Sequence, residues 1–151
     1  MMGLASVLLS SDGRIGRRTW WLFVVAVLTL YFAAFGATVV VSGLDLALDR
    51  DFYWLSIGAM IGTVYPAFCF NAKRFQDRGK ARWWALWATA TDLLMTAVDM
   101  LSGLHGGVST LVEWSVYGPV YAVMLWYFVE LGCLRGTSGE NLYGPDPLAG
   151  S

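Results

Sequence analysis

The chain has 151 residues, of which 57% are hydrophobic and 14% are charged, and its formal net charge is −1. A soluble domain carries about 25% charged residues, so a chain this apolar cannot face water on all sides, and we place it in the membrane class. The near-neutral net charge suggests that the protein has no nucleic-acid partner.

Basic residues and tryptophans precede the first apolar stretch. Arg14, Arg17 and Arg18 are followed directly by Trp20 and Trp21. Positive charge beside indole rings is typical of a cytoplasmic membrane interface, where the charges meet the headgroups and the rings lie at the boundary. For residues 1–11, an interfacial helix and a disordered end both stay open.

Four apolar stretches are long enough to cross a bilayer as helices, at a rise of about 1.5 Å per residue. Backbone groups in lipid have no water to bond, so we expect helices despite the many β-branched residues. The sequence therefore predicts an all-α integral membrane bundle of four transmembrane helices in one domain, residues 1–151, with spans at residues 20–43, 53–72, 83–103 and 114–134.

The basic residues are distributed unequally between the two predicted sides. Only Arg50 of the ten Lys and Arg residues falls in an outer loop, and short loops rich in Lys and Arg stay in the cytoplasm. We therefore predict a multi-pass protein with both termini in the cytoplasm and a short cytoplasmic loop at residues 73–84. The residues on the inner side are Arg14, Arg17, Arg18, Lys73, Arg74, Arg78, Lys80, Arg82 and Arg135.

The central loop has its own expected contacts. Asp77 is flanked by Arg74 and Arg78, which predicts a charge-assisted bond that shapes the loop. Gly79 then offers a turn position. Glu130, near the inner end of the fourth span, is expected to pair with a basic residue of this loop.

Polar residues share one face of the third span: Thr89, Asp92, Thr96 and Asp99. A carboxyl group inside a span is costly and marks a functional candidate. One interpretation is a proton or cation site of a small transporter. The other, which we favour because no intramembrane Lys or Arg partners the acids, is a hydrogen-bond contact between helices or with a partner protein.

The sequence contains few residues or motifs that are suited to catalysis. The chain has one His and two Cys, no metal-ligand spacing, and no nucleophile or phosphate-binding motif. We expect no enzymatic activity, no metal and no cofactor. Because the cytoplasm is reducing, Cys69 and Cys133 are predicted to be free, buried thiols.

Small size, abundant aromatic residues and the basic inner face favour a non-enzymatic accessory subunit that binds a membrane protein complex or anionic lipid. The cations can also serve only to set orientation, and both readings stay open. Gly58 and Gly62 form a G-x-x-x-G pair, which allows close helix approach in a homo-oligomer but is also common in membrane helices. The alternative function is the ion- or proton-coupled transporter.

Three separated stretches carry a resemblance: residues 13–21 (GRIGRRTWW), residues 73–79 (KRFQDRG) running into Trp83 and Trp84, and residues 139–147 (GENLYGPDP). Together they resemble the DUF805 family of small bacterial inner-membrane proteins. In that family they lie before the first span, between the second and third, and after the last. The resemblance implies an inner-membrane location and the topology, and it implies no activity.

The resemblance also implies that the three stretches meet at the cytoplasmic face. We therefore predict that the tail folds back onto the basic loop, with Asp77 or Asp146 bonded to Arg14, Arg17 or Arg18. Gln76 stands where the family usually has a His, so no role for an imidazole is expected there. The candidate residues are the basic cluster Arg14, Arg17, Arg18, Lys73, Arg74, Gln76, Asp77, Arg78 and Gly79, and the tail residues Asn141, Tyr143, Gly144, Pro145, Asp146 and Pro147.

Overall fold

The computed structural model describes residues 8–42, 50–104 and 110–149, with some helical side chains, including those of Asp92 and Asp99, outside the description. The regular secondary structure of these residues is helical, with no β-strand, so the all-α prediction is confirmed. The helices are α2 (Arg17–Ser42), α4 (Arg50–Asp77), α5 (Trp84–Leu104) and α6 (Thr110–Tyr127), and α6 continues into a π-helix, η1 (Phe128–Cys133).

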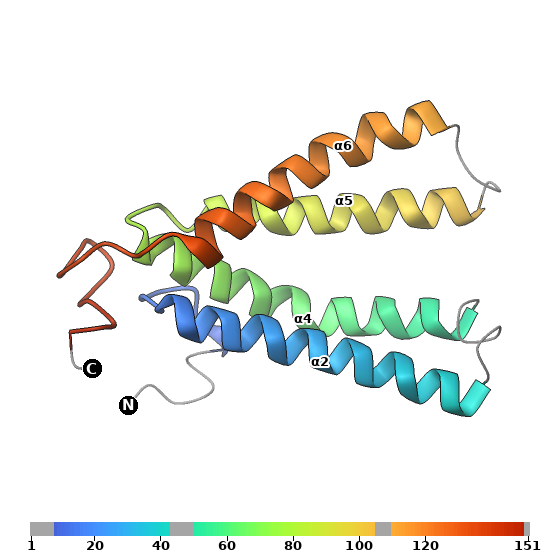
Figure 1. The fold of residues 1–151 in the computed structure, drawn as a ribbon, viewed down its shortest axis with the longest axis horizontal. Helices are drawn as coiled ribbons and strands as arrows, with labels where there is room; N and C mark the ends of the chain where they lie inside the picture. The colour runs from blue at the N-terminus through green and yellow to red at the C-terminus, as the bar shows by residue number, and fades with distance from the viewer. Residues whose placement is uncertain (1–7, 43–49, 105–109, 150–151) are drawn as a thin grey trace.

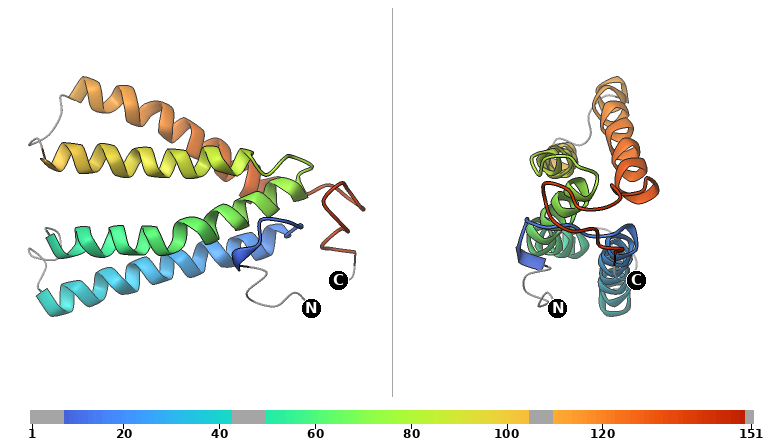
Figure 2. Two further views of the ribbon diagram at one scale, coloured as in Figure 1. Left: turned by 180° about the vertical axis from the view of Figure 1, so that it is seen from behind. Right: turned by 90° about the vertical axis from the view of Figure 1, so that its left-hand side faces the viewer.

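The helices form two pairs that meet at one end of the molecule. Helix α2 packs on α4, α4 on α5, and α5 on α6, while η1 returns to contact both α2 and α4. The two pairs diverge away from the end that holds the chain termini (Figures 1 and 2). We call this end the basic end, because the nine inner Lys and Arg residues named above lie there, at the start of α2, the end of α4 and the segments that follow α4 and η1.

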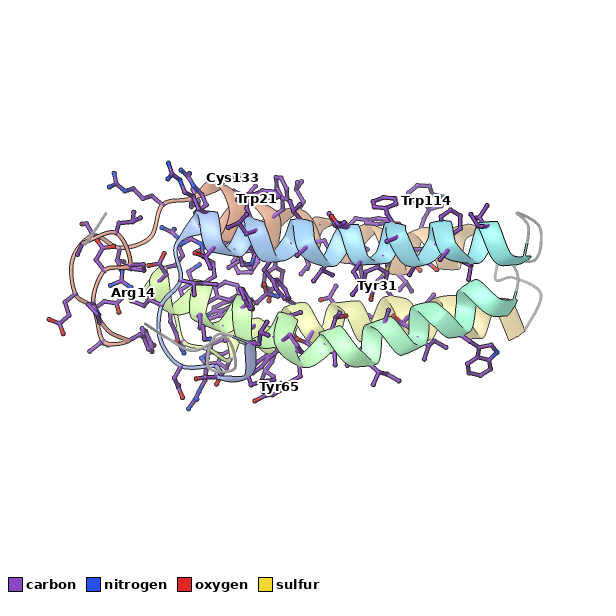
Figure 3. All side chains as sticks on the ribbon, turned by 90° about the horizontal axis from the view of Figure 1, so that it is seen from below. Arg14, Trp21, Tyr31, Tyr65, Trp114 and Cys133 are labelled. Atoms are coloured by element: carbon purple, nitrogen blue, oxygen red, sulfur yellow. The ribbon has the colours of Figure 1, made fainter. Side chains whose placement is uncertain are left out.

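The buried core also lies at the basic end. It consists of Ile15, Trp20, Phe70, Ala72, Phe75, Ala85, Ala88, Tyr127 and Leu131. Elsewhere large apolar side chains point outward, for example Phe32 at 72%, Val40 at 85% and Ile61 at 67% exposure. Figure 3 shows side chains projecting from the helices along their length. Large apolar side chains exposed along the length of the helices are typical of a protein solvated by lipid.

Two stretches of the described helices are long and apolar enough to cross a membrane: Arg17–Val40 and Trp114–Cys133. They lie close to the predicted spans 20–43 and 114–134. Helices α4 and α5 have sufficient length, 28 and 21 residues, but no stretch of their described residues is both long and apolar enough. The spans at 53–72 and 83–103 thus stay a prediction from the sequence.

Helix α4 continues into the segment that we predicted as loop. It runs to Asp77, so only residues 78–83 connect it to α5, and the expectation of a loop from residue 73 was wrong. The helix ends in a Schellman motif: Gly79 N donates to Gln76 O at 3.0 Å and Lys80 N to Phe75 O at 2.8 Å. Gly79 has φ 72°, so the expected turn position is confirmed. Charged residues set the predicted span limit, whereas this glycine ends the helix.

Candidate site at the basic end

Asp77 is the centre of a buried ion-pair cluster. Its Oδ1 accepts hydrogen bonds from Arg14 Nε at 3.1 Å and Nη2 at 3.0 Å, and its Oδ2 pairs with Arg74 Nη1. The side chains of Arg14 and Arg74 are each 1% exposed and that of Asp77 is 4% exposed. The predicted charge-assisted bond of Asp77 is confirmed. Burial lowers the pKa of Arg74, and the Asp77 carboxylate opposes that shift.

Arg14 uses all five of its N–H donors. Besides its two bonds to Asp77, it donates from Nη1 to Gly139 O at 2.7 Å and Gly144 O at 3.1 Å, and from Nη2 to Thr137 O at 2.6 Å. A guanidinium offers five donors in a fixed planar fork, which suits this arrangement of acceptors. One side chain therefore joins the segment before α2, the end of α4 and the tail (residues 136–149).

The tail also bonds directly to the end of α4. Thr137 donates to Asp77 O from its N–H at 2.8 Å and from Oγ1 at 3.0 Å. Asn141 Nδ2 donates to Gln76 O at 3.0 Å, and Asn141 Oδ1 accepts from Tyr143 N at 2.8 Å. The prediction that the tail folds back onto the central segment is confirmed, with Arg14 as the arginine that pairs with Asp77.

Two features inside the tail shape it for these contacts. Gly144, with φ 130°, exchanges two backbone hydrogen bonds with Asn141 at 3.1 Å each. Asp146 accepts from Leu148 N at 2.9 Å and from Gly139 N at 3.0 Å, and these two bonds lower the pKa of its carboxyl group. Asp146 is therefore ionised at neutral pH, but it serves the tail's own turn instead of pairing with an arginine.

Gly136 was not singled out from the sequence, yet its small size is required here. A Cβ at this position would lie 2.7 Å from Asp77 Oδ1. The carboxylate cannot move away easily because two guanidinium groups hold it. Glycine at 136 thus lets the tail pass directly over the ion-pair cluster.

The end of η1 presents a run of five backbone carbonyls, and each accepts a hydrogen bond from a side chain. The donors are Arg74 Nε to Leu131 O (2.8 Å), Trp21 Nε1 to Gly132 O (3.1 Å), Arg17 Nη1 to Cys133 O (2.9 Å), Arg74 Nη2 to Leu134 O (2.5 Å) and Arg78 Nη1 to Arg135 O (2.5 Å). The last carbonyls of a helix have no intrahelical partner and carry partial negative charge. Trp21 and three arginines, Arg17, Arg74 and Arg78, satisfy them here.

Gly132 makes room for the tryptophans of α2. A Cβ at this position would lie 3.0 Å from Trp21 Cζ2 and 3.1 Å from Trp20 Cζ3. Trp20 is anchored as well, since its Nε1 donates to Asn71 Oδ1 at 3.0 Å. The close contact of η1 with α2 therefore depends on glycine.

We expect Gly132→Ala to lower the free energy of unfolding by about 1–3 kcal/mol, the usual cost of overpacking. The matched control is Gly36→Ala, because a Cβ at Gly36 meets nothing within 4 Å. Thermal unfolding in detergent measures both. Equal melting temperatures for the two variants would contradict a tight contact at Gly132.

Glu130 lies in η1 and is 5% exposed. Its Oε1 accepts from Lys80 Nζ at 2.8 Å and Arg78 Nε at 3.2 Å, so the predicted pairing with the central segment is confirmed. Lys80 Nζ also lies 5.1 Å from the ring centroid of Trp126 and 5.6 Å from that of Trp84. The connection between α4 and α5 is thereby fixed to η1 by both charge and aromatic contact.

Two more of the predicted residues are buried at the end of α4. Lys73 lies with its Nζ 6.0 Å from the centroid of the Phe70 ring. Gln76 is buried, and its Oε1 has no hydrogen-bond partner in the described part of the chain.

The predicted polar face of the third span, with Thr89 and Thr96, lies on α5. The side chains of Asp92 and Asp99 are outside the described residues, so the roles assigned to them stay predictions.

The cysteine prediction was half right. Both thiols are free, and Cys69 is buried, but Cys133 is exposed. In η1 the inward positions are taken by Glu130, Leu131 and Gly132, which leaves Cys133 facing outward. Among the residues the structure describes, no three His, Cys, Asp or Glu side chains gather as a group that could hold a metal ion.

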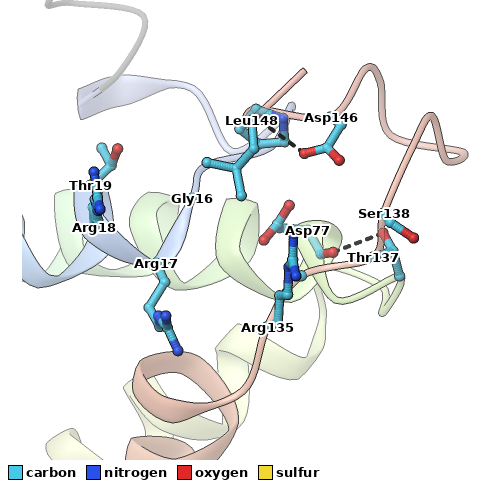
Figure 4. Close-up of a pocket in the computed structure, with 12 residues that line it drawn as sticks. Gly16, Arg17, Arg18, Thr19, Asp77, Arg135, Thr137, Ser138, Asp146 and Leu148 are labelled. Carbon is cyan, nitrogen blue, oxygen red and sulfur yellow. Dashed lines mark hydrogen bonds between the residues drawn. The ribbon is translucent and has the colours of Figure 1, made fainter. Parts of the chain in front are cut away.

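A cavity of about 500 Å³ lies beside the ion-pair cluster. Figure 4 shows it between the start of α2, with Gly16, Arg17 and Arg18, and the tail, with Asp77 and Arg135 between the two. The tail contributes Gly136, Thr137, Ser138, Asp146, Pro147 and Leu148 to its wall.

Residues 8–145 match the model of a family described as a protein of unknown function, DUF805. The chain is 29% identical over 147 residues to the uncharacterised protein YiiR of Escherichia coli (strain K12), covering 96% of this chain and 90% of that protein. It is 27% identical over 140 residues to the inner membrane protein YhaI of the same strain, covering 93% and 87%. No solved structure shows significant similarity. The chain belongs to the DUF805 family.

Proposed function

We propose that this protein crosses the bacterial inner membrane four times, with both termini and the basic end in the cytoplasm. We further propose that it acts without catalysis, as an accessory subunit that binds a larger membrane protein complex or anionic lipid. The proposal rests on one observation: the buried acids at the basic end, which could otherwise perform acid–base chemistry, are already bonded within the fold. Asp77, Glu130 and Arg14 have their partners within the fold.

Similarity to YhaI supports the location, because that relative is named an inner membrane protein. The exposed apolar side chains support immersion in lipid. The gathering of the inner Lys and Arg residues at one end supports the orientation, since positive charge near the ends of spans is retained in the cytoplasm.

A small-residue face of α4, with Gly58 and Gly62, is available for contact with a helix of a partner protein. Among the described residues, a Cβ at Gly58 or Gly62 meets nothing within 4 Å, so this small-residue pair makes no close contact with another described helix. Close approach of a second helix at such a pair is the usual way that small residues serve association in lipid. These glycines are consistent with an interaction subunit.

Orientation is tested by labelling single cysteines with a membrane-impermeant maleimide. Leu142 in the tail is 97% exposed, so Leu142→Cys in a Cys133→Ser background gives an accessible thiol while Cys69 stays buried. We expect labelling in inside-out vesicles and none in intact spheroplasts. Ala47→Cys, in a predicted outer loop, is the matched control and should give the reverse. Labelling of the Leu142→Cys variant from outside would overturn the topology.

The accessory role is tested by purification from native membranes in a mild detergent, followed by mass spectrometry of proteins and lipids. We expect a larger membrane protein, or anionic lipid, to be retained in stoichiometric amount. A chain that purifies alone and free of anionic lipid would contradict the role.

A further inference from the structure

The cavity at the basic end is lined by three arginines with unused donors. The guanidinium groups of Arg18 and Arg135 make no hydrogen bond or ion pair with any described residue, and Arg17 uses only Nη1, toward Cys133 O. Arg14 and Arg74, in contrast, are turned inward and occupied by Asp77 and backbone carbonyls. The cavity therefore gathers the cations that the fold itself leaves available.

The first turn of α2 adds donors to the same wall. The backbone N–H groups of Arg17, Arg18 and Thr19 have no partner among the described residues. Gly16, which precedes the helix, has no side chain that could cap them. These N–H groups and the positive end of the helix dipole favour an anion.

Neither carboxylate in the wall makes an ion pair with Arg17, Arg18 or Arg135, although the charge of Arg135 acts on Asp146 at longer range. Asp77 is shared between Arg14 and Arg74, and Asp146 accepts two backbone N–H bonds within the tail. Counting charges, Arg17, Arg18 and Arg135 outnumber Asp146, and the group of Arg14, Arg74 and Asp77 is itself net positive. The cavity thus keeps an excess of positive charge.

The position of the cavity along the membrane normal suits a headgroup. Trp20 and Trp21 follow Arg17 and Arg18 within one helical turn, at about 1.5 Å rise per residue. If these tryptophans lie at the membrane boundary, the arginines lie where lipid phosphates are found. A planar guanidinium binds phosphate oxygens through two parallel hydrogen bonds.

We propose that this cavity binds a phosphate group through Arg17, Arg18, Arg135 and the first turn of α2, an inference that rests on the proposed membrane orientation. The group is the phosphate of an anionic lipid headgroup or a free phosphate ion. Because the residues of the first turn of α2 and Arg135 line the same cavity, a single phosphate can bridge α2 and the tail.

The experiment measures the melting temperature of the full chain, purified in a neutral detergent, against increasing ligand concentration. The probes are dioctanoyl phosphatidic acid, dioctanoyl phosphatidylcholine and inorganic phosphate. We expect phosphatidic acid to raise the melting temperature saturably and the zwitterionic phosphatidylcholine not to. An equal effect of inorganic phosphate identifies the free ion as the ligand, and no effect identifies the lipid headgroup.

The diagnostic variants are Arg18→Gln and Arg135→Gln, whose side chains hold no other part of the described fold. Each should weaken binding about tenfold while leaving the melting temperature without ligand unchanged, since a hydrogen bond to a charged group is lost. Arg82→Gln is the matched control: it removes the same charge at the basic end, but Arg82 pairs with exposed Asp12 and does not line the cavity. Binding that is absent, or that Arg82→Gln weakens equally, would overturn the site.

The phosphate-binding experiment can fail independently of the experiments that test the proposed function. If phosphate binding fails while the Leu142→Cys variant is still labelled only from the cytoplasmic side and a partner co-purifies, the cavity assignment alone is wrong. If that variant is labelled from the periplasm, the orientation fails and the headgroup source with it.

Discussion

Asp77→Asn is expected to lower the free energy of unfolding by about 3–5 kcal/mol, the largest single effect we predict for this chain. The substitution keeps the shape of the side chain but removes the charge of the carboxylate that pairs with both Arg14 and Arg74. Both guanidinium groups are 1% exposed at the side chain, so water cannot replace the carboxylate. Breaking a buried pair by removing one partner costs more than the pair itself contributes, because the remaining charge stays desolvated.

The measurement is thermal or denaturant unfolding of the purified protein in detergent. Asp12→Asn is the matched control, since Asp12 pairs with Arg82 at 3.0 Å but the two side chains are 76% and 57% exposed. An exposed pair contributes less than about 1 kcal/mol, so this control should unfold almost as the wild type does. Similar melting temperatures for Asp77→Asn and the wild type would show that the ion-pair cluster does not stabilise the fold.

Much of the basic end was predictable because charge and aromatic residues follow the membrane interface. That nine of the ten Lys and Arg residues gather at one end of the molecule was expected from a count along the chain. The pairing of Glu130 with the central segment followed from a buried acid near a basic loop. Which arginine meets Asp77 was not predictable, because Arg14, Arg17 and Arg18 lie within five residues and only tertiary geometry separates them.

Two features of the site could not be predicted from the amino-acid sequence. Apart from Glu130, the π-helical turn at residues 128–133 is as apolar as the preceding α-helix, so nothing in its composition marks the change of helix type. Gly132 and Gly136 resemble the many other glycines, and their role appears only when Trp21 and Asp77 are placed beside them. The end of α4 was misjudged because hydropathy locates the membrane boundary, whereas a helix ends where its capping residues allow.

Arg14→Lys is expected to release the tail while the helices stay folded. Lysine keeps the charge beside Asp77 but offers three donors on a flexible stem, so the planar set of five bonds cannot form. The carbonyls of Thr137, Gly139 and Gly144 then lose their shared donor group. These carbonyls are only part-buried and can bond water, so we expect a loss of about 2 kcal/mol, smaller than that of Asp77→Asn.

The effect should appear in hydrogen exchange of the tail. The N–H groups of Thr137, Asn141 and Gly144 are hydrogen-bonded in the fold, and a loss of about 2 kcal/mol corresponds to exchange more than about tenfold faster. Arg82→Lys makes the same chemical change at an exposed position and should leave tail exchange unchanged. Tail exchange in Arg14→Lys that matches the wild type would mean that Asn141 and Thr137 alone hold the tail against α4, and that the five-donor fork of Arg14 is dispensable.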